Sequence, residues 1–455
     1  MPVMLKKTLG NGASRMFVAL KTKLMAALGA FALLTGCALQ TEKTTAASRA
    51  QDDDQPNIIW IIADDQAYSD FGFMGHNLVR TPHLDKLASE SAVFPNGYVP
   101  TSLCRASLAT LITGKYAFDH GICFNDPPDG IPHSETFRFL QMQKPMPMAL
   151  KAAGYRSMQT GKFWEGNYAN GGFTDGMTQG TRHGDAGLRI GRKTMQPIDE
   201  FLGDVGEDPF FLWFAPYLPH APFDAVEAYK EPFRGKGLGE RTIGYYANIS
   251  WLDDTVGQLM KLLEKNGKTD NTVIMFIVDN GWLPNRDGES FRDLQDRVIR
   301  FDPRSKSSPY EGGVRTPVFV RWPDRIKPGR HDDLVSSIDF FPTTLALAGL
   351  PQHEALPGRN LQPFLEERSS LTPRTVFGEI YYHTSVDLDD PKVNVTHRWA
   401  RKGDWKLILN DFDSGQPELY NLASDPDEKT NLARASQHAD QISSLRAEIE
   451  EWWPD

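Results

Sequence analysis

The sequence has little cysteine, no net positive charge and no apolar run long enough to cross a membrane. Its 455 residues include three cysteines, Cys37, Cys104 and Cys123, so we expect no framework of disulfide bonds. The formal net charge of −10 argues against a nucleic-acid partner, because binding to a phosphate backbone requires a positive field. The remaining composition, 40% hydrophobic and 24% charged residues, is typical of a globular protein with one large domain and a smaller one.

The first 37 residues have the pattern of an export signal. Basic residues precede a short apolar stretch, Leu24 to Leu34, which is well below the roughly 20 residues that a membrane span needs. Leu34-Thr35-Gly36-Cys37 resembles the lipobox of bacterial lipoproteins. We therefore predict a signal peptide over 1–37 with Cys37 lipidated, and a flexible tether over 38–55. The mature protein would be an exported lipoprotein, held to the membrane by its lipid anchor, in the periplasm or at the outer membrane or cell surface.

Short apolar runs alternate with helical patterns through the middle of the chain. The runs 57–63 and 272–278 are almost wholly apolar, as expected of parallel strands that are buried on both faces. Further strands are predicted at 210–215 and 316–321, and helices at 81–92 and 246–265. This alternation predicts an α/β fold, with a large mixed, mostly parallel sheet flanked by helices.

The pattern changes after about residue 365, where short strands follow one another. We predict a small antiparallel sheet from the segments 375–382, 399–401, 405–409 and 418–422, then an amphipathic helix over 436–453. The predicted domains are a catalytic domain over 56–365 and a smaller C-terminal subdomain over 366–455.

Two polar pairs directly follow two of the predicted strands. Asp64 and Asp65 come after the first run, and Asp279 and Asn280 come after a later one. Ligand sites of parallel sheets lie at the carboxyl ends of the strands, and four oxygen ligands suit a hard divalent cation such as Ca²⁺. The alternative is that each pair only caps a loop.

The segment from Cys104 to Lys115 resembles the signature of type I, formylglycine-dependent sulfatases, members of the alkaline phosphatase superfamily. The resemblance implies an alkaline-phosphatase-like fold in which a maturase oxidises Cys104 to formylglycine, and the hydrate of this aldehyde attacks sulfur. It also implies one Ca²⁺ ion that holds a sulfate oxygen and activates the attacking hydroxyl. The implied metal ligands are Asp64, Asp65, Cys104, Asp279 and Asn280.

Three further residues match catalytic positions of that family. Lys162, in the segment Thr160 to Gly166, and Lys306, ahead of Tyr310-Glu311-Gly312-Gly313, match the lysines of the sulfate pocket. His220, in Leu218-Pro219-His220-Ala221-Pro222, matches the histidine that assists the leaving alcohol. The plainer alternatives are a solvated loop lysine and a surface-loop histidine.

Two positions depart from the family pattern. Leu108 stands where most members have arginine, and Trp164 stands where a second histidine is expected. Arg105 lies three residues before Leu108, so in a helix the two share a face, and we predict that Arg105 replaces the missing catalytic cation. The base that replaces the histidine at Trp164 stays open between another side chain, a carboxylate and water.

The sequence thus predicts an enzyme that hydrolyses sulfate esters, most plausibly on a sulfated carbohydrate or polysaccharide. Aromatic and basic residues in 282–300 and 381–397 are expected to line sugar subsites. The alternatives are a phosphodiester or phosphonate monoester hydrolase of the same superfamily, and a catalytically weak sulfoglycan-binding protein. The sugar, the sulfate position, exo or endo action, the oligomeric state and the start at Met1 or Met16 stay open.

Overall fold

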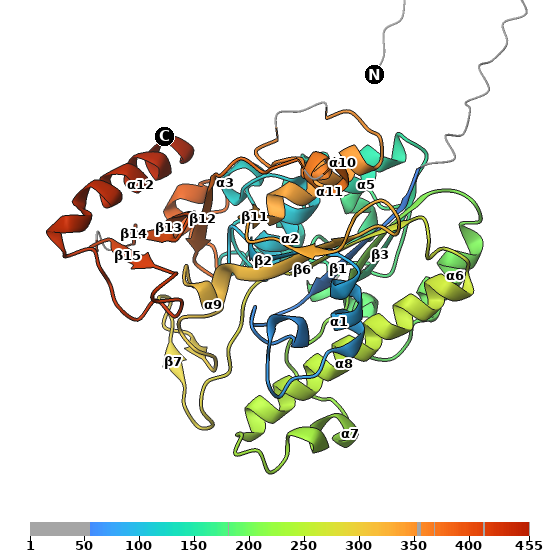
Figure 1. The fold of residues 1–455 in the computed structure, drawn as a ribbon, viewed down its shortest axis with the longest axis horizontal. Coiled ribbons are helices and arrows are strands. Elements are labelled where there is room, and N and C mark those ends of the chain that lie inside the picture. The colour runs from blue at the N-terminus through green and yellow to red at the C-terminus, as the bar shows by residue number, and fades with distance from the viewer. Residues whose placement is uncertain (1–54, 181, 353–355, 368, 413–414, 455) are drawn as a thin grey trace, which may run out of the picture. The chain divides into compact units, whose positions relative to one another are not determined.

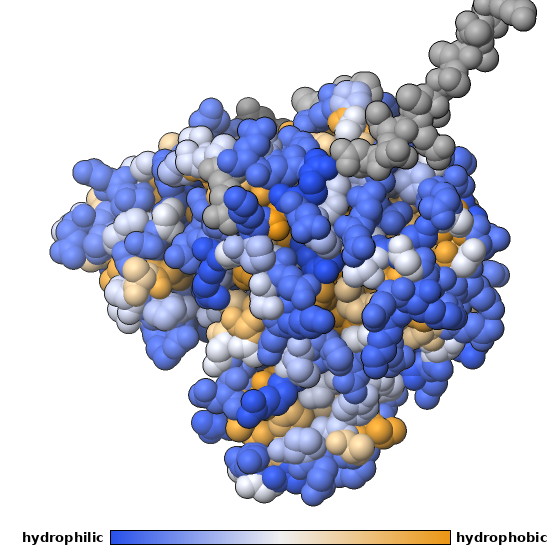
Figure 2. All heavy atoms as spheres, turned by 45° about the vertical axis from the view of Figure 1, so that its right-hand side comes forward, coloured by the Kyte–Doolittle hydropathy of each residue, from blue (hydrophilic) through white to orange (hydrophobic). Residues whose placement is uncertain are grey.

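The computed structural model describes residues 55–180, 182–352, 356–367, 369–412 and 415–454. The predicted signal peptide, with Cys37, and the predicted tether lie outside these residues, except for residue 55. Within the described ranges, no helix combines the length and apolar character needed to span a membrane. Hydrophilic side chains cover most of the face in Figure 2, and apolar side chains form small patches between them.

A large sheet forms the middle layer of the molecule (Figure 1). It has nine strands in the order β10-β2-β9-β6-β1-β5-β3-β4, with β11 paired to β2. The central strands β1 (Asn57–Ala63), β6 (Thr272–Val278), β5 (Phe210–Ala215) and β3 (Arg156–Gly161) are parallel. β9 (Arg315–Arg321) runs antiparallel to β6 and to β2 (Ala92–Tyr98). The predicted mixed, mostly parallel sheet is therefore confirmed.

Helices cover both faces of this sheet, because successive side chains of each strand point to opposite sides. Ile58 and Trp60 of β1 pack in one apolar cluster with α2 (Cys104–Thr113) and α10 (Phe340–Leu347). Ile59 and Ile61 pack in a second cluster with α1 (Pro82–Ser89), α6 (Gln196–Asp204) and α8 (Glu240–Lys265). Figure 1 shows α2 and α10 on one side of the sheet and α1 and α8 on the other. Every residue of β1 is consequently buried.

Some element boundaries differ from the sequence prediction. The helix expected over 81–92 ends at Ser89, because Ala92 already begins strand β2. The helix expected from residue 246 begins at Glu240, where Asp287 accepts hydrogen bonds from the backbone N–H groups of Glu240 and Arg241. An acceptor at this position satisfies donors that have no partner inside the helix.

A second sheet follows, as predicted for the C-terminal part of the chain. β12 (Thr375–Tyr381), β13 (Val395–Lys402), β14 (Trp405–Asn410) and β15 (Glu418–Asn421) are antiparallel neighbours in this order. Helix α12 (Ala439–Trp452) packs Leu445 and Ile449 against the leucines of β14 and β15. The small sheet and its helix lie beside the large sheet in Figure 1.

A buried ionic cluster joins the second sheet to the first. Lys406 of β14 is fully buried, and its Nζ lies 3.0 Å from a carboxylate oxygen of Glu311 and 3.0 Å from one of Glu428. Glu311 begins the short helix α9 (Glu311–Val314), which leads directly into β9. The C-terminal sheet therefore holds the segment that carries Lys306 in place.

Short elements complete the described structure. The helices are α3 (Ala117–His120), α4 (Arg138–Gln141), α5 (Met146–Lys151), α7 (Glu227–Lys230) and α11 (Gln362–Glu367). The strands are β4 (Asp175–Gly176), β7 (Phe291–Arg292), β8 (Val298–Ile299), β10 (Gly329–Arg330) and β11 (Val335–Ser336). β7 and β8 pair with each other as a separate ribbon.

Candidate active site

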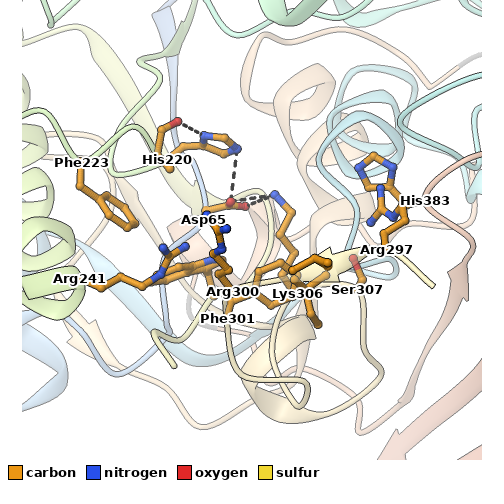
Figure 3. A pocket seen from close by; sticks show the side chains of 14 residues that line it. Asp65, His220, Phe223, Arg241, Arg297, Arg300, Phe301, Lys306, Ser307 and His383 are labelled. Carbon is orange, nitrogen blue, oxygen red and sulfur yellow. Dashed lines mark hydrogen bonds and ion pairs between the residues drawn. The ribbon is translucent and has the colours of Figure 1, made fainter. Parts of the chain in front are cut away.

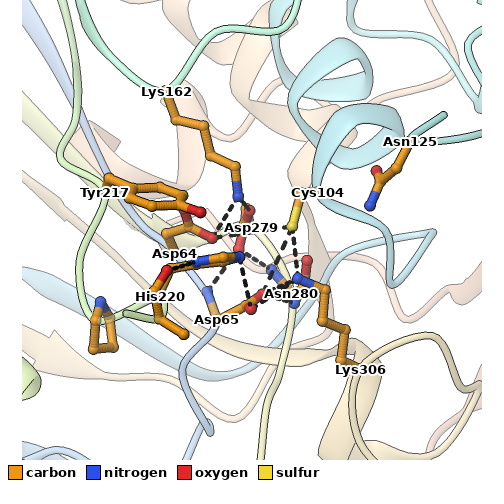
Figure 4. A network of polar contacts seen from close by, with 12 residues as sticks. Asp64, Asp65, Cys104, Asn125, Lys162, Tyr217, His220, Asp279, Asn280 and Lys306 are labelled. Atoms are coloured by element: carbon orange, nitrogen blue, oxygen red, sulfur yellow. Dashed lines mark hydrogen bonds and ion pairs between the residues drawn. The ribbon is translucent and has the colours of Figure 1, made fainter. Parts of the chain in front are cut away.

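The predicted site residues other than Arg105 meet in one cluster at the carboxyl ends of the central strands (Figure 4). Asp64 and Asp65 follow β1, and Asp279 and Asn280 follow β6, so both pairs leave the carboxyl ends of parallel neighbours. Strand β9 is antiparallel to β6, so the segment with Lys306 enters the sheet at the edge where the parallel strands end. The topology thus brings residues more than 200 positions apart into one cluster.

Three buried carboxylates form the centre of this cluster. The backbone N–H of Asp65 donates to Asp279 Oδ1 at 3.0 Å, and Asn280 Nδ2 donates to Asp65 Oδ1 at 2.7 Å. Burial and the charge of Asp64 raise the pKa of Asp279 to about 7. Asp65 adopts a left-handed backbone conformation with φ of 60°, which aspartate tolerates better than most residues and which is common at functional sites.

The donor set fits a hard cation. Asp64 Oδ2 and Asn280 Oδ1 are buried and have no hydrogen-bond partner, although buried oxygens of this kind normally have one. Ligand atoms of Asp64, Asp65, Cys104 and His220 lie within 4.8 Å of one another. A cation held by Asp64, Asp65, Asp279 and Asn280 would satisfy the unpartnered oxygens and offset the repulsion among the carboxylates.

Cys104 is the first residue of helix α2 and faces the carboxylate cluster. Its Sγ lies 3.7 Å from Asp65 Oδ1 and 2.9 Å from Lys306 Nζ. The next backbone N–H, of Arg105, donates to Asn125 Oδ1 at 3.0 Å and so anchors the first turn. Burial raises the pKa of the Cys104 thiol, so the unmodified side chain is a protonated thiol and a poor nucleophile.

Two buried lysines flank the cluster. Lys162 Nζ lies 2.6 Å from Asp64 Oδ1, and Lys306 Nζ lies 2.6 and 2.7 Å from the two oxygens of Asp65. Lys162 follows Gly161, whose φ is 77° and where a Cβ would lie 1.8 Å from the carbonyl oxygen of Ala215. Only glycine therefore permits the turn that directs Lys162 into the site.

His220 lies on the loop after β5 and faces Asp65. Its Nε2 is 3.4 Å from Asp65 Oδ2, and its Nδ1 contacts the backbone carbonyl of Ala221. A carbonyl can only accept, so Nδ1 carries a proton and Nε2 is the nitrogen that faces the site. The ring of Tyr217 stacks on the imidazole with centroids 4.3 Å apart, which fixes its orientation.

Arg105 lies in α2, but its guanidinium pairs with Glu165. Nε and Nη2 donate to the two carboxylate oxygens at 2.6 and 2.7 Å, and both side chains are buried. One nitrogen, Nη1, is buried without a hydrogen-bond partner. Leu108, at the usual arginine position, belongs to the apolar core. The role of Arg105 in place of that arginine stays a prediction. Arg105 would have to bind substrate through Nη1, or would have to release Glu165 first.

Trp164 packs against His183, a histidine near the site that was not predicted from the sequence. The ring of His183 packs edge-on against Trp164, with centroids 4.2 Å apart, and lies 6.1 Å from the ring of His220. Burial, followed by the charge of Lys162, lowers the pKa of His183 to about 2, so its imidazole is neutral. His183 adopts a φ of 66° within an irregular loop, and no local motif marks such a position.

A cavity of about 650 Å³ opens from the cluster (Figure 3). Its inner end is lined by Asp65, His220 and Lys306, and most of the remaining lining side chains are aromatic, aliphatic or basic. These include Trp282, Arg297, Arg300 and His383 from the two segments predicted to line sugar subsites, and also Arg241 of α8, which the sequence did not indicate.

Known proteins are similar to this chain in sequence and in fold. Residues 56–350 match the Sulfatase family, and residues 301–453 match the C-terminal part of N-sulphoglucosamine sulphohydrolase. Human N-acetylgalactosamine-6-sulfatase is 27% identical, over 87% of this chain and 85% of that protein. N-acetylgalactosamine-6-O-sulfatase of Bacteroides thetaiotaomicron is 26% identical, over 94% of this chain and 98% of that protein.

Among solved structures, the phosphonate monoester hydrolase of Agrobacterium radiobacter has a TM-score of 0.66 at 20% identity, covering 87% of this chain and 95% of that one. This likeness concerns the fold alone. The family match extends over most of the chain and includes the segments that carry Asp64, Cys104 and Lys306. The protein therefore belongs to the sulfatase family of the alkaline phosphatase superfamily and is a sulfuric ester hydrolase.

Proposed function

We propose that this sulfatase removes sulfate from carbohydrate esters, with formylglycine made from Cys104 by a maturase and one Ca²⁺ ion in the carboxylate cluster. The observation that carries the proposal is the placement of Cys104. Its sulfur is buried at the start of a helix, 3.7 Å from an acidic ligand and 2.9 Å from a lysine. A protein that only bound sulfated sugars would need neither an oxidisable cysteine nor buried cation ligands around it.

Different residues of the site would have different roles in ester cleavage. Lys162 and Lys306 place two positive charges at the cluster, where they would hold sulfate oxygens as negative charge develops. His220 directs Nε2 toward the site, and the acid is its doubly protonated form; burial lowers the pKa of the ring to about 3, while the charge of Asp65 favours that form. In that form it would donate the Nε2 proton to the leaving alcohol, since sugar alkoxides are poor leaving groups. The Ca²⁺ ion would polarise a sulfate oxygen and acidify the attacking hydroxyl.

His183 is the side chain that we propose as the base in place of a histidine at Trp164. Trp164 holds the His183 ring edge-on, and Lys162 and His220 face the same space. The imidazole is neutral and has an unprotonated nitrogen. A sulfate group bound at Lys162 would offset the positive charges that, together with burial, lower its pKa to about 2, and so would make it a stronger base. With His183 as the base, the carboxylates of the cluster stay free to bind the cation, and no ordered water is needed as the base.

The shape of the site favours a sugar of more than one residue. The cavity at Lys306 adjoins a second cavity of about 350 Å³, which shares Ile299, Phe301, Ser307 and His383 with it. Aromatic rings in such a cleft stack on sugar faces.

Relatives from human and Bacteroides thetaiotaomicron are named N-acetylgalactosamine-6-sulfatases, so a 6-sulfated hexosamine is the first substrate to test. We place the enzyme outside the cytoplasm, on the lipid anchor proposed at Cys37.

A comparison of ester classes on one preparation tests the proposal. The protein would be produced together with a formylglycine-generating maturase, and released sulfate would be measured from sulfated mono- and oligosaccharides. A phosphonate monoester and a phosphodiester would be assayed on the same sample. Turnover of sulfated sugars well above both phosphorus esters supports the proposal. Faster turnover of a phosphorus ester would favour the superfamily alternative, and binding without turnover would favour the sulfoglycan-binding alternative.

A further inference from the structure

The cavity beyond the sulfate site contains more positive charge than one sulfate group requires. Three arginines line it, Arg241, Arg297 and Arg300, in addition to Lys306. Arg297 is already neutralised, because its Nε lies 2.7 Å from Asp293 Oδ2. Among the described residues, no carboxylate forms an ion pair with Arg241 or Arg300. These two cations are therefore available to a ligand.

Arg241 packs against two aromatic rings and forms no ion pair within the described residues. Its guanidinium lies 5.6 Å from the ring centroid of Phe223 and 5.8 Å from that of Trp282. Its Nε is buried without a hydrogen-bond partner. Asp287, the acid whose charge acts on Arg241, accepts hydrogen bonds from the backbone N–H groups of residues 240 and 241. Contacts with aromatic faces fix a guanidinium plane and leave its N–H edge free to bind an oxyanion.

Arg241 and Arg300 reinforce each other's positive potential. Burial and the charge of Arg300 lower the pKa of Arg241, and Asp287 offsets only part of this shift, as expected of two like charges that line one cavity. Such a pair is costly in a half-buried site unless an anion binds between or beside the charges. Figure 3 shows Arg241 and Arg300 near Asp65 and Phe301, in the same cavity as Lys306. The overall charge of the chain is −10, so this concentration of positive charge is local.

We propose that Arg241 and Arg300 form a second anion subsite, which binds a sulfate or carboxylate group carried by the carbohydrate in addition to the sulfate that is cleaved. The inference rests on the proposed carbohydrate substrate and narrows it to sugars with at least two anionic groups. Arginine suits this role because its planar fork can donate two parallel hydrogen bonds to either group. Trp282 and Phe223 provide the apolar wall behind the fork.

Binding to protein without turnover tests the subsite separately from catalysis. Cys104→Ala protein would be titrated calorimetrically with three sugars. These are N-acetylgalactosamine 6-sulfate, its 4,6-disulfate, and a disaccharide that joins a uronic acid to the 6-sulfated sugar. The variants Arg241→Met and Arg300→Met keep apolar bulk, and Arg234→Met is the control, because Arg234 pairs with Glu227 and Glu240 outside the cavity.

We expect the disulfate or the uronate sugar to bind at least about tenfold more tightly than the monosulfate, since a hydrogen bond to a charged group contributes about that much. Which of the two is preferred identifies the second group. Arg241→Met and Arg300→Met should each reduce this preference, and Arg234→Met should not. Equal affinities for all three sugars, a preference that persists in both variants, or no binding at millimolar concentration would each overturn the subsite. Failure of the matured enzyme to release sulfate would instead contradict the proposed function.

Discussion

At the scale of single residues, the site combines groups that the family pattern identifies with groups that only the structure reveals. The acidic pairs, Cys104, Lys162, Lys306 and His220 could be selected from the sequence, because each lies in a short motif or directly after an apolar strand. His183 and Arg241 could not, because they reach the site from an irregular loop and from a helix turn that the sequence did not predict. The neutralisation of Arg105 by Glu165 depends on a contact across 60 residues, which no local pattern encodes.

The Arg105–Glu165 pair gives the first prediction. Both side chains are buried, so removing one partner leaves an uncompensated charge, and Arg105→Met or Glu165→Met should each cost about 3–5 kcal/mol of unfolding free energy. The double variant should recover most of that loss, as measured by denaturant unfolding in a double-mutant cycle. If Arg105 also acts on substrate, matured Arg105→Ala should lower kcat about a hundredfold, and Arg105→Lys should recover only part of that loss because lysine lacks the planar fork. A wild-type kcat in matured Arg105→Ala would remove Arg105 from the catalytic residues.

His183 gives the second prediction. We expect His183→Gln to lower kcat about a hundredfold or more with little change in KM, because a lost general base affects the chemical step. The matched control is His133→Gln, since the ring of His133 also lies near Trp164, at 6.2 Å, but its Nε2 pairs with Asp126. The formylglycine content of each variant would be measured first. Equal losses of kcat in the two variants would show that the packing around Trp164 matters rather than a base at His183.

A buried acid away from the site gives a pH prediction. Burial raises the pKa of Asp70 to about 6, from an ordinary value of 3.8. The folded state therefore holds a proton that the unfolded state releases, so this contribution to stability is complete below about pH 4 and is lost as pH rises through about 6. Asp70→Asn has no such group to titrate, so between pH 4 and pH 7.5 the wild type should lose stability that the variant keeps. We expect the unfolding free energy of the wild type to fall relative to that of Asp70→Asn by up to about 3 kcal/mol over this range. Urea unfolding at both pH values measures it, and a difference independent of pH would contradict it.

At the scale of elements, apolar runs that are buried on both faces were predictable, and weakly apolar strands were not. β1, β5 and β6 are continuous runs of large apolar residues, so their positions follow from composition alone. β2 contains Pro95-Asn96-Gly97 and β3 reads Arg-Ser-Met-Gln-Thr-Gly, so neither shows a clear strand pattern. They form strands because paired neighbours and helices on both faces bury them, which is a tertiary effect that outweighs local preference.

The junction between the two sheets gives a prediction at this scale. Lys406→Met should cost about 3–5 kcal/mol of unfolding free energy, because Glu311 and Glu428 would remain buried without their cation. The control, Lys402→Met, removes a half-exposed partner of Glu448 near the end of β13 and should cost about 1 kcal/mol or less. Denaturant midpoints of the two variants and wild type make the comparison. Similar midpoints for Lys406→Met and Lys402→Met would show that the buried cluster does not secure the second sheet.

At the scale of the whole molecule, the topology explains how a protein with a net charge of −10 forms a site for anions. Parallel strands bring their carboxyl ends to one edge, and the antiparallel β9 delivers Lys306 to the same edge. Acidic residues there are placed to hold the proposed cation, Lys162 lies beside them, and Lys306, Arg241 and Arg300 add positive charge along one cavity. Short-range attraction in a site with little water can exceed the screened repulsion from distant surface charges.

The proposed activity requires that Cys104 becomes an aldehyde, whose hydrate attacks the sulfate ester. The most direct measurement is the mass of the peptide containing Cys104, taken from the preparation whose release of sulfate from a 6-sulfated hexosamine is assayed, with Cys104→Ala protein treated identically. We expect a peptide lighter than the cysteine form by the exchange of SH and H for a carbonyl oxygen. Turnover should be proportional to the converted fraction, and Cys104→Ala should show almost none. Full turnover by protein that contains only unmodified cysteine would contradict it.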